Sequence, residues 1–247
     1  MHYTTALTLL TGSLAIAAPL DGRAVTQFPK GTSWDIVLNT KSLELSDFQK
    51  APGTAIDIDL FDLSQPTNRI AELAKTKKVI CYFSAGSRED WRPGAAQFRP
   101  SDYGRNMIWK GENWVDVKSP RVREIMKARI ELAAKSGCHA VDPDNVDGYS
   151  AYADYVNYLA SVAKQNNLAI GLKNALAIIP AVLPNIQFAI NEQCHEFGEC
   201  TEYAQVSKAN LAVFNVEYEL KDCSHPTGVV LSSVFKPLDL DTVGGQC

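Results

Sequence analysis

Eight short runs with strand patterns, apolar or alternating, constrain the fold of this chain more than any other feature, and most of them are separated by segments with helical periodicity. They begin near residues 33, 55, 79, 139, 168, 188, 211 and 228. Runs of this length are typical of buried strands, and strands that alternate with helices form parallel βαβ units. Eight such units predict an α/β fold, a closed (β/α)8 TIM barrel in a single domain. A doubly wound open sheet is the alternative, but no Gly-x-Gly-x-x-Gly follows the first run.

Two of the connecting segments predict long helices. Pro120 begins one that extends to about residue 135, and the other covers residues 152–165. Shorter helices are expected over residues 67–75, 175–183 and 203–209. The segment 88–116 has no such pattern. It carries three of the four tryptophans, which are Trp91, Trp109 and Trp114. These rings either pack the loop against the barrel or offer flat faces on which sugars stack.

The N-terminal residues have the features of a secretory signal peptide. Residues 6–17 are apolar but too few to span a bilayer, and Ala15-Ile16-Ala17 supplies a small-x-small cleavage pattern. We therefore expect residues 1–17 to be a signal peptide, residues 18–247 to form the barrel, and the protein to be secreted and extracellular. A buried N-terminal helix is the alternative. No later segment is long and apolar enough to anchor the chain, so no membrane partner is expected.

Six cysteines agree with an oxidising compartment, although their number leaves the connectivity open. The pairs favoured by position are Cys194 with Cys200 and Cys223 with Cys247, whereas Cys81 and Cys138 could pair or remain buried thiols. No Cys-x-x-Cys or His-x-x-His spacing occurs, so neither a metal ion nor a cofactor is expected. The net charge of −4, without clustered Lys and Arg, argues against a nucleic-acid partner. We expect a monomer.

Polar side chains, dominated by carboxylates, follow six of the predicted strands. Barrel enzymes carry their sites at the C-terminal ends of the strands, so these residues are expected to share one pocket. The central group is the run from Val141 to Tyr149, in which three aspartates follow an apolar segment. The candidates, strand by strand, are Asp59 and Asp62; Tyr82, Ser84, Ser87, Glu89, Asp90 and Trp91; Asp142, Asp144 and Asp147; Lys173 and Asn174; Asn191 and Glu192; and Glu217 and Tyr218.

Carboxylates at the ends of different strands suit the cleavage of a glycosidic bond. One carboxylic acid protonates the leaving oxygen, while a second carboxylate attacks the sugar or activates water. Two other uses stay open. Asp142, Asp144 and Asp147 could bind calcium, although the EF-hand pattern is absent, or they could make only structural hydrogen bonds. A serine hydrolase is not expected, because there is no Gly-x-Ser-x-Gly and the four histidines are scattered.

Four blocks of the chain resemble signature blocks of glycoside hydrolase family 114, in the same order. They are Val79 to Pro93, Val141 to Tyr149, Gly171 to Ala175, and Asn191 to Cys194 with Cys200 following. The resemblance implies a secreted (β/α)8 barrel that acts as an endo-α-1,4-polygalactosaminidase. It also implies a catalytic pair formed by Glu192 with Asp144, or with Asp142 on the same strand face.

The chain departs from the family pattern at two places. His139-Ala140 stands where members often have Asp-Gly, and the segment from Tyr149 to Tyr155 is shorter than in many members. The second difference affects a loop that is expected to border the cleft. The number of sugar-binding subsites therefore does not follow from the resemblance.

The substrate expected from this resemblance is a cationic, galactosamine-containing polysaccharide. Its units carry an ammonium group near neutral pH, which an acidic cleft favours. The carboxylates outside the catalytic pair are therefore expected to bind substrate. Within the pair, Asp144 should stay ionised and Glu192 should hold the proton, its pKa raised by neighbouring negative charge. A non-catalytic carbohydrate-binding barrel is the alternative function, and a metal-dependent hydrolase is a third.

Overall fold

Eight parallel strands form the barrel that the sequence predicts. The computed structural model describes residues 24–40, 42–64, 68–148 and 152–247, so the expected signal peptide and part of the shortened segment after Gly148 lie outside the described residues. Neighbouring strands are hydrogen-bonded in the order β1-β2-β3-β7-β8-β9-β10-β11, and each pair is parallel. Their bounds are β1 Trp34–Val37, β2 Ala55–Asp59, β3 Lys78–Ser84, β7 Ala140–Asp144, β8 Ala169–Lys173, β9 Phe188–Glu192, β10 Ala212–Glu217 and β11 Leu231–Phe235.

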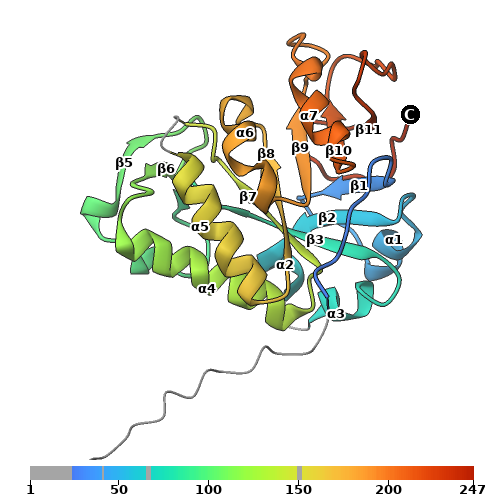
Figure 1. Ribbon diagram of the computed structural model, residues 1–247. Coiled ribbons are helices and arrows are strands. Elements are labelled where there is room, and N and C mark those ends of the chain that lie inside the picture. The colour runs from blue at the N-terminus through green and yellow to red at the C-terminus, as the bar shows by residue number, and fades with distance from the viewer. Residues whose placement is uncertain (1–23, 41, 65–67, 149–151) are drawn as a thin grey trace, which may run out of the picture.

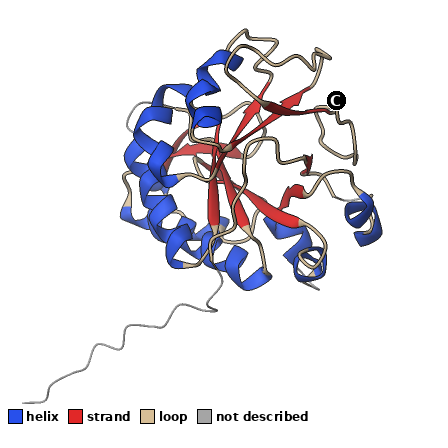
Figure 2. Ribbon diagram, turned by 45° about the vertical axis from the view of Figure 1, so that its right-hand side comes forward, coloured by secondary structure: helices blue, strands red, loops and turns tan. Residues whose placement is uncertain are grey.

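Helices cover the outside of the barrel, and the two longest, α4 (Pro120–Ser136) and α5 (Tyr152–Gln165), lie side by side over β7 and β8 (Figures 1 and 2). The Ser119 hydroxyl caps α4 by accepting a hydrogen bond from the N–H of Val122, and Gly137 ends it in a left-handed conformation. The shorter helices are α1 Leu45–Lys50, α2 Leu60–Ser64, α3 Arg69–Leu73, α6 Ile179–Val182 and α7 Ala204–Lys208. Short 3-10 helices cover Ala95–Gln97, Pro100–Asp102, Leu176–Ile178, Leu183–Asn185 and Cys200–Tyr203.

Two connections differ from the sequence prediction. The helix expected over residues 175–183 is a single α-helical turn between two 3-10 helices, in a stretch interrupted by Pro180 and Pro184, which lack a backbone N–H. The segment 88–116 contains strands rather than only a loop. Its strands β4 (Ser87–Glu89), β5 (Tyr103–Asn106) and β6 (Glu112–Val115) form an antiparallel sheet in the order β4-β6-β5, which we call the small sheet.

The interior of the barrel is apolar toward the N-terminal ends of the strands, and we call this part the barrel floor. Phe28, from the segment before β1, closes it, with its ring 4.9 Å from the ring of Phe188. Trp34 stacks on Phe214 with ring centres 4.7 Å apart. Gly171 leaves the space that Phe188 fills, since a Cβ at Gly171 would lie 2.2 Å from that ring. The floor is therefore a closed apolar core.

The C-terminal tail completes the barrel between β11 and β1. The carbonyl oxygen of Leu240 accepts hydrogen bonds from the N–H groups of Leu38 and Asn39. Asp35 of β1 forms a fully buried ion pair with Lys236, which follows β11. Through these contacts the tail joins β1 to β11, the two strands at the ends of the hydrogen-bonded order.

Three disulfides connect the six cysteines. The predicted bond between Cys194 and Cys200 is confirmed, as is the attachment of the tail through Cys223 and Cys247. Of the two possibilities for Cys81 and Cys138, the structure shows the bonded one, which links β3 to the residues before β7. No helix in the described part of the chain is long and apolar enough to cross a membrane.

Candidate active site

The inward face of five strands changes from apolar to polar at its last positions. Because side chains alternate along a strand, the inward positions of the floor continue to the C-terminal ends of the strands. We call this end the barrel mouth. The inward residues that reach it are Asp59 of β2, Tyr82 of β3, Asp144 of β7, Lys173 of β8 and Glu192 of β9. The mouth therefore brings the two residues of the predicted catalytic pair together.

Lys173 is the central residue of the mouth. It is only 2% exposed, and its Nζ lies 3.7 Å from Glu192 Oε2, 3.9 Å from Asp144 Oδ1 and 4.0 Å from Asp142 Oδ2. The ammonium also lies 5.2 Å from the centre of the Tyr82 ring. Burial alone would lower the pKa of Lys173, but the three carboxylates outweigh it and raise the pKa well above its usual value. Lys173 is therefore charged, and it links both members of the pair.

Asp144 is held in place by the turn that follows β3. The hydroxyl of Tyr82 donates to Asp144 Oδ2 at 3.0 Å, and the backbone N–H groups of Ala85 and Gly86 donate to the Asp144 carbonyl. A Cβ on Gly86 would lie 1.6 Å from the backbone oxygen of Asn145, so this approach requires glycine. Burial raises the pKa of Asp144 in spite of Lys173. This direction is opposite to the one expected for the ionised member of the pair, the role that the sequence analysis gave to Asp144.

Glu192 is held by donors from the strands on both sides. The hydroxyl of Tyr218 donates to Oε1 at 2.5 Å, and the side-chain amide of Asn174 donates to Oε2 at 3.1 Å. Burial opposes ionisation of Glu192, but Lys173 and these two donors outweigh it and lower its pKa. The expectation that neighbouring negative charge raises this pKa is therefore wrong. The sequence shows the carboxylates, but not that the lysine is buried between them.

Beneath Lys173, Asp57 of β2 and Asp142 of β7 form a fully buried pair of carboxyl groups. Their oxygens have no described hydrogen-bond partner other than the opposite carboxyl. Burial raises the pKa of Asp57 well above its usual value and raises the pKa of Asp142 to about 7. We interpret the pair as sharing one proton and one negative charge. Asp142 thus lies beneath Lys173 and helps to keep its ammonium group charged. Asp57 was not among the candidate residues, although the alternation of β2 places it on the face of Asp59.

Arg92 occupies the acidic side of the mouth that the sequence analysis assigned to substrate. Its guanidinium pairs with Asp59, with Asp62 at 3.1 Å and with Glu89 at 3.3 Å. Arg129, which is buried, lies 3.9 Å from the other oxygen of Glu89. These three carboxylates are therefore neutralised by arginines of the same chain. The expectation that these carboxylates are free to bind substrate did not take account of Arg92.

A cavity of about 510 Å³ extends from Asp144 to the small sheet. Trp91 and Trp109 line it and are 53% and 55% exposed, so much of each side chain is open to solvent. Glu112 of β6 also lines it and was missed by the sequence analysis, because it lies in the segment without a strand pattern. The full lining is Tyr82, Glu89, Trp91, Met107, Ile108, Trp109, Lys110, Glu112, Asp144 and Asn145.

Several predicted residues lie outside this cavity. Ser84 is buried and hydrogen-bonds with Ser87 and Asn145. Asn191 and Glu217 are fully buried and stand one position out of phase with the inward faces of β9 and β10, so they are not placed to contact substrate. Glu217 instead accepts a hydrogen bond from the backbone of the loop after Glu192. Two more residues are exposed, Asp90 beside the small sheet and Asp147 at a separate hollow next to Asn174.

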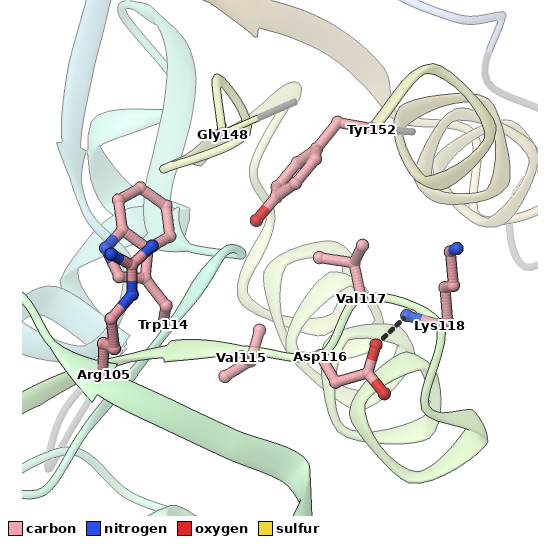
Figure 3. A pocket seen from close by; sticks show the side chains of 8 residues that line it. All are labelled: Arg105, Trp114, Val115, Asp116, Val117, Lys118, Gly148 and Tyr152. Atoms are coloured by element: carbon pink, nitrogen blue, oxygen red, sulfur yellow. Dashed lines mark hydrogen bonds between the residues drawn. The ribbon is translucent and has the colours of Figure 1, made fainter. Parts of the chain in front are cut away.

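A second cavity, of about 450 Å³, borders β5, β6 and the start of α5 (Figure 3). Tyr152 points into it toward Trp114 and Arg105. Asp116 is its one carboxylate, and the Asp116 side chain accepts the backbone N–H of Lys118 at 3.0 Å. Neither Asp144 nor Glu192 borders this cavity, so the predicted chemistry belongs to the barrel mouth.

One group in the described part of the chain has the spacing of metal ligands. The ligand atoms of Cys194, His195 and Cys200 lie within 4.8 Å of one another. The two sulfurs form a disulfide, which removes both thiolates as ligands. This group therefore does not fit a zinc ion.

A barrel with two carboxyl groups near one lysine at its mouth has the pair of acids that a carbohydrate-cleaving hydrolase needs. The profile of glycoside hydrolase family GH114 matches residues 16–247. The chain therefore belongs to family GH114 and is a glycoside hydrolase.

Solved structures agree with this assignment. The crystal structure of Aspergillus fumigatus Ega3 in complex with galactosamine is 35% identical with a TM-score of 0.82, and the match covers 91% of this chain and 98% of that one. The glycoside hydrolase domain of PelA from Pseudomonas aeruginosa is 12% identical with a TM-score of 0.66, covering 86% and 97%. Amy13B of Eubacterium rectale is 9% identical with a TM-score of 0.53, covering 80% and 59%. The last two show the fold alone. No curated protein matches the chain.

Proposed function

We propose that this glycoside hydrolase is a secreted monomer that cleaves α-1,4 linkages within galactosamine-containing polysaccharide, with Asp144 and Glu192 as its catalytic pair. The observation that carries the proposal is the position of both carboxylates on one buried ammonium, Lys173, with Asp144 lining an open cavity. Three disulfides support an oxidising compartment. Galactosamine in the similar Ega3 crystal supports the substrate class.

The opposite pKa shifts of Asp144 and Glu192 support their role as a pair. Glycosidic cleavage needs one carboxylic acid and one carboxylate at the same bond. Burial favours the protonated form of Asp144, while Lys173 and two hydrogen-bond donors favour the ionised form of Glu192. Carboxyl groups whose environments separate their pKa values are the ones that can divide these two tasks. Asp142 is less suitable, because it is fully buried beneath Lys173.

The cavity beside Asp144 supports a polymeric substrate. Its volume of about 510 Å³ is in the range of ligand pockets, and it extends from the barrel onto the small sheet. Trp91 and Trp109 offer exposed aromatic surface on which sugar rings can stack. A chain bound there would extend beyond the cleaved bond, as internal cleavage requires.

The test is incubation of the purified protein with deacetylated, galactosamine-rich galactosaminogalactan. We expect release of oligomers of several lengths, measured by chromatography and mass spectrometry, and no release by the Asp144→Asn variant. Exhaustive chelation should leave the rate unchanged, because the pair needs no metal. Tight binding of the polymer without any release would contradict the proposal and would favour a carbohydrate-binding barrel. Release of monomers alone would contradict internal cleavage.

A further inference from the structure

Most carboxylates of the mouth already have a cation of the protein beside them. Asp59, Asp62 and Glu89 pair with Arg92, and Glu89 also lies near Arg129. The members of the catalytic pair both lie within 4 Å of Lys173. A cationic sugar therefore meets a site whose negative charges are largely compensated, and net acidity alone does not show which group receives its ammonium.

Glu112 is the exception among the carboxylates that line the cavity. It is 6% exposed, and in the described part of the chain it forms no ion pair. Both described hydrogen bonds of its side chain, from Ser87 and from Asn145, go to Oε1. Oε2 has no described donor and is not among the fully buried side-chain atoms that lack a partner, and Glu112 lines the cavity. Lys110 lines the same cavity but is exposed.

The surroundings of Glu112 add to its need for a cation. Burial raises the pKa of this carboxyl in spite of the hydrogen bond from Ser87, and nearby Glu89 and Asp144 add to the rise. A carboxylate taken out of water without a partner is costly, and an ammonium placed against it offsets that cost. The cavity is wide enough to admit such a group from solvent, next to Asp144 and beside the exposed ring of Trp109.

We propose that Oε2 of Glu112 binds the ammonium group of a galactosamine unit, in a subsite formed by the small sheet beside Asp144. Glu112 is then the residue that distinguishes galactosamine from N-acetylgalactosamine, because acetylation removes the charge and adds bulk. This inference rests on the proposed function and assigns the substrate's positive charge to one residue. Ser87 and Asn145 act as positioning residues, since their hydrogen bonds to Oε1 leave Oε2 free for the ligand.

The experiment compares the wild type with Glu112→Gln and with Glu202→Gln. The glutamine can still accept the hydrogen bonds of Ser87 and Asn145 through its amide oxygen but carries no charge. Glu202 is exposed and does not line the cavity, so its substitution controls for net charge. With deacetylated polymer we expect KM of Glu112→Gln to rise about tenfold or more, the loss expected for one charge-assisted hydrogen bond, with kcat within about twofold. Its preference for deacetylated over partly N-acetylated polymer should fall by a similar factor.

Unchanged KM and unchanged preference in Glu112→Gln would overturn the inference. A parallel fall of kcat and thermal stability, with the preference retained, would also overturn it by showing a structural role. The wild type, measured alongside, separates the two proposals, because absence of turnover there contradicts the proposed function instead. In that case binding of galactosamine oligomers by titration calorimetry decides the inference, with weaker binding by Glu112→Gln expected and equal binding contradicting it.

Discussion

The barrel floor and the barrel mouth are built by the same strands, yet their interiors differ completely. On β9, Phe188 and Ile190 pack into the floor, and two residues later Glu192 faces Lys173. On β8, Ala169 lies in the floor and Lys173 in the mouth. The floor buries aromatic and aliphatic surface, which stabilises the fold. The mouth buries charge and leaves several polar oxygens unpartnered, and neither feature stabilises the fold.

The difference indicates a division of tasks along each strand. Full burial of a phenylalanine side chain contributes about 1.5–3 kcal/mol, whereas buried carboxylates crowded around one lysine cost stability even when they are paired. Burial in the floor therefore offsets the stability cost of the mouth. Substitutions in the two regions should change the free energy of unfolding in opposite directions.

The largest expected effect is on turnover, from changes in the mouth. Asp144→Asn and Glu192→Gln keep the shape of each side chain but remove its acid–base function. We expect each to lower kcat on the deacetylated polymer by roughly 10³-fold or more. Glu202→Gln, an exposed change of the same chemical type, should have wild-type kcat. An active Asp144→Asn together with an inactive Asp142→Asn would show that the wrong aspartate of β7 has been assigned.

The next largest effect is on stability, from changes in the floor. Phe214→Ala removes a ring that stacks on Trp34 and leaves a cavity in the closed core. We expect the free energy of unfolding in urea to fall by about 3–5 kcal/mol. Phe197→Ala is the matched control and should change it little, because Phe197 is 63% exposed. Equal losses from both substitutions would contradict the account of the floor as the stabilising region.

The smallest expected effect is the pH dependence of stability, and it comes from the buried pair in the mouth. Burial raises the pKa of Asp142 to about 7 and that of Asp57 well above its usual value. An acid whose pKa is higher in the folded state binds its proton more tightly there, so its contribution to stability is lost as the pH rises from about 4 to about 7. In Asp57→Asn the side-chain amide can donate a hydrogen bond to Asp142, so this bond no longer depends on a carboxyl proton. The melting temperature should therefore fall less steeply between pH 5 and 8 in Asp57→Asn than in the wild type. Parallel curves of melting temperature against pH for the two proteins would contradict the shared proton.

The sequence is sufficient for the eight strands and for the Cys194–Cys200 bond. The strands are predictable because most are short apolar runs and β2 alternates apolar and acidic residues, which are both local patterns typical of strands. The small sheet is not predictable in this way, because its strands are only three or four residues long and polar, and they pair through non-local contacts. Glu112 was missed for the same reason.

Alternation along the strands could have sharpened the candidate site further. It places Asn191 and Glu217 out of phase with Glu192 and places Asp57 in phase with Asp59. The position of Arg92 against three carboxylates could not be predicted, because it depends on how the small sheet folds over the mouth. The same holds for Lys173, which outweighs burial at Glu192 and lowers its pKa, but does not outweigh burial at Asp144.

The most direct test of the contrast between floor and mouth is the free energy of unfolding of Asp144→Asn, measured in urea near neutral pH beside the wild type. Asp144 is a partly buried acid whose ionised form burial disfavours, so a neutral amide at this position removes a cost rather than a support. The account predicts equal or greater stability for Asp144→Asn, together with the loss of turnover. A fall in stability comparable to that of Phe214→Ala would contradict it, because the mouth would then hold the fold together as the floor does.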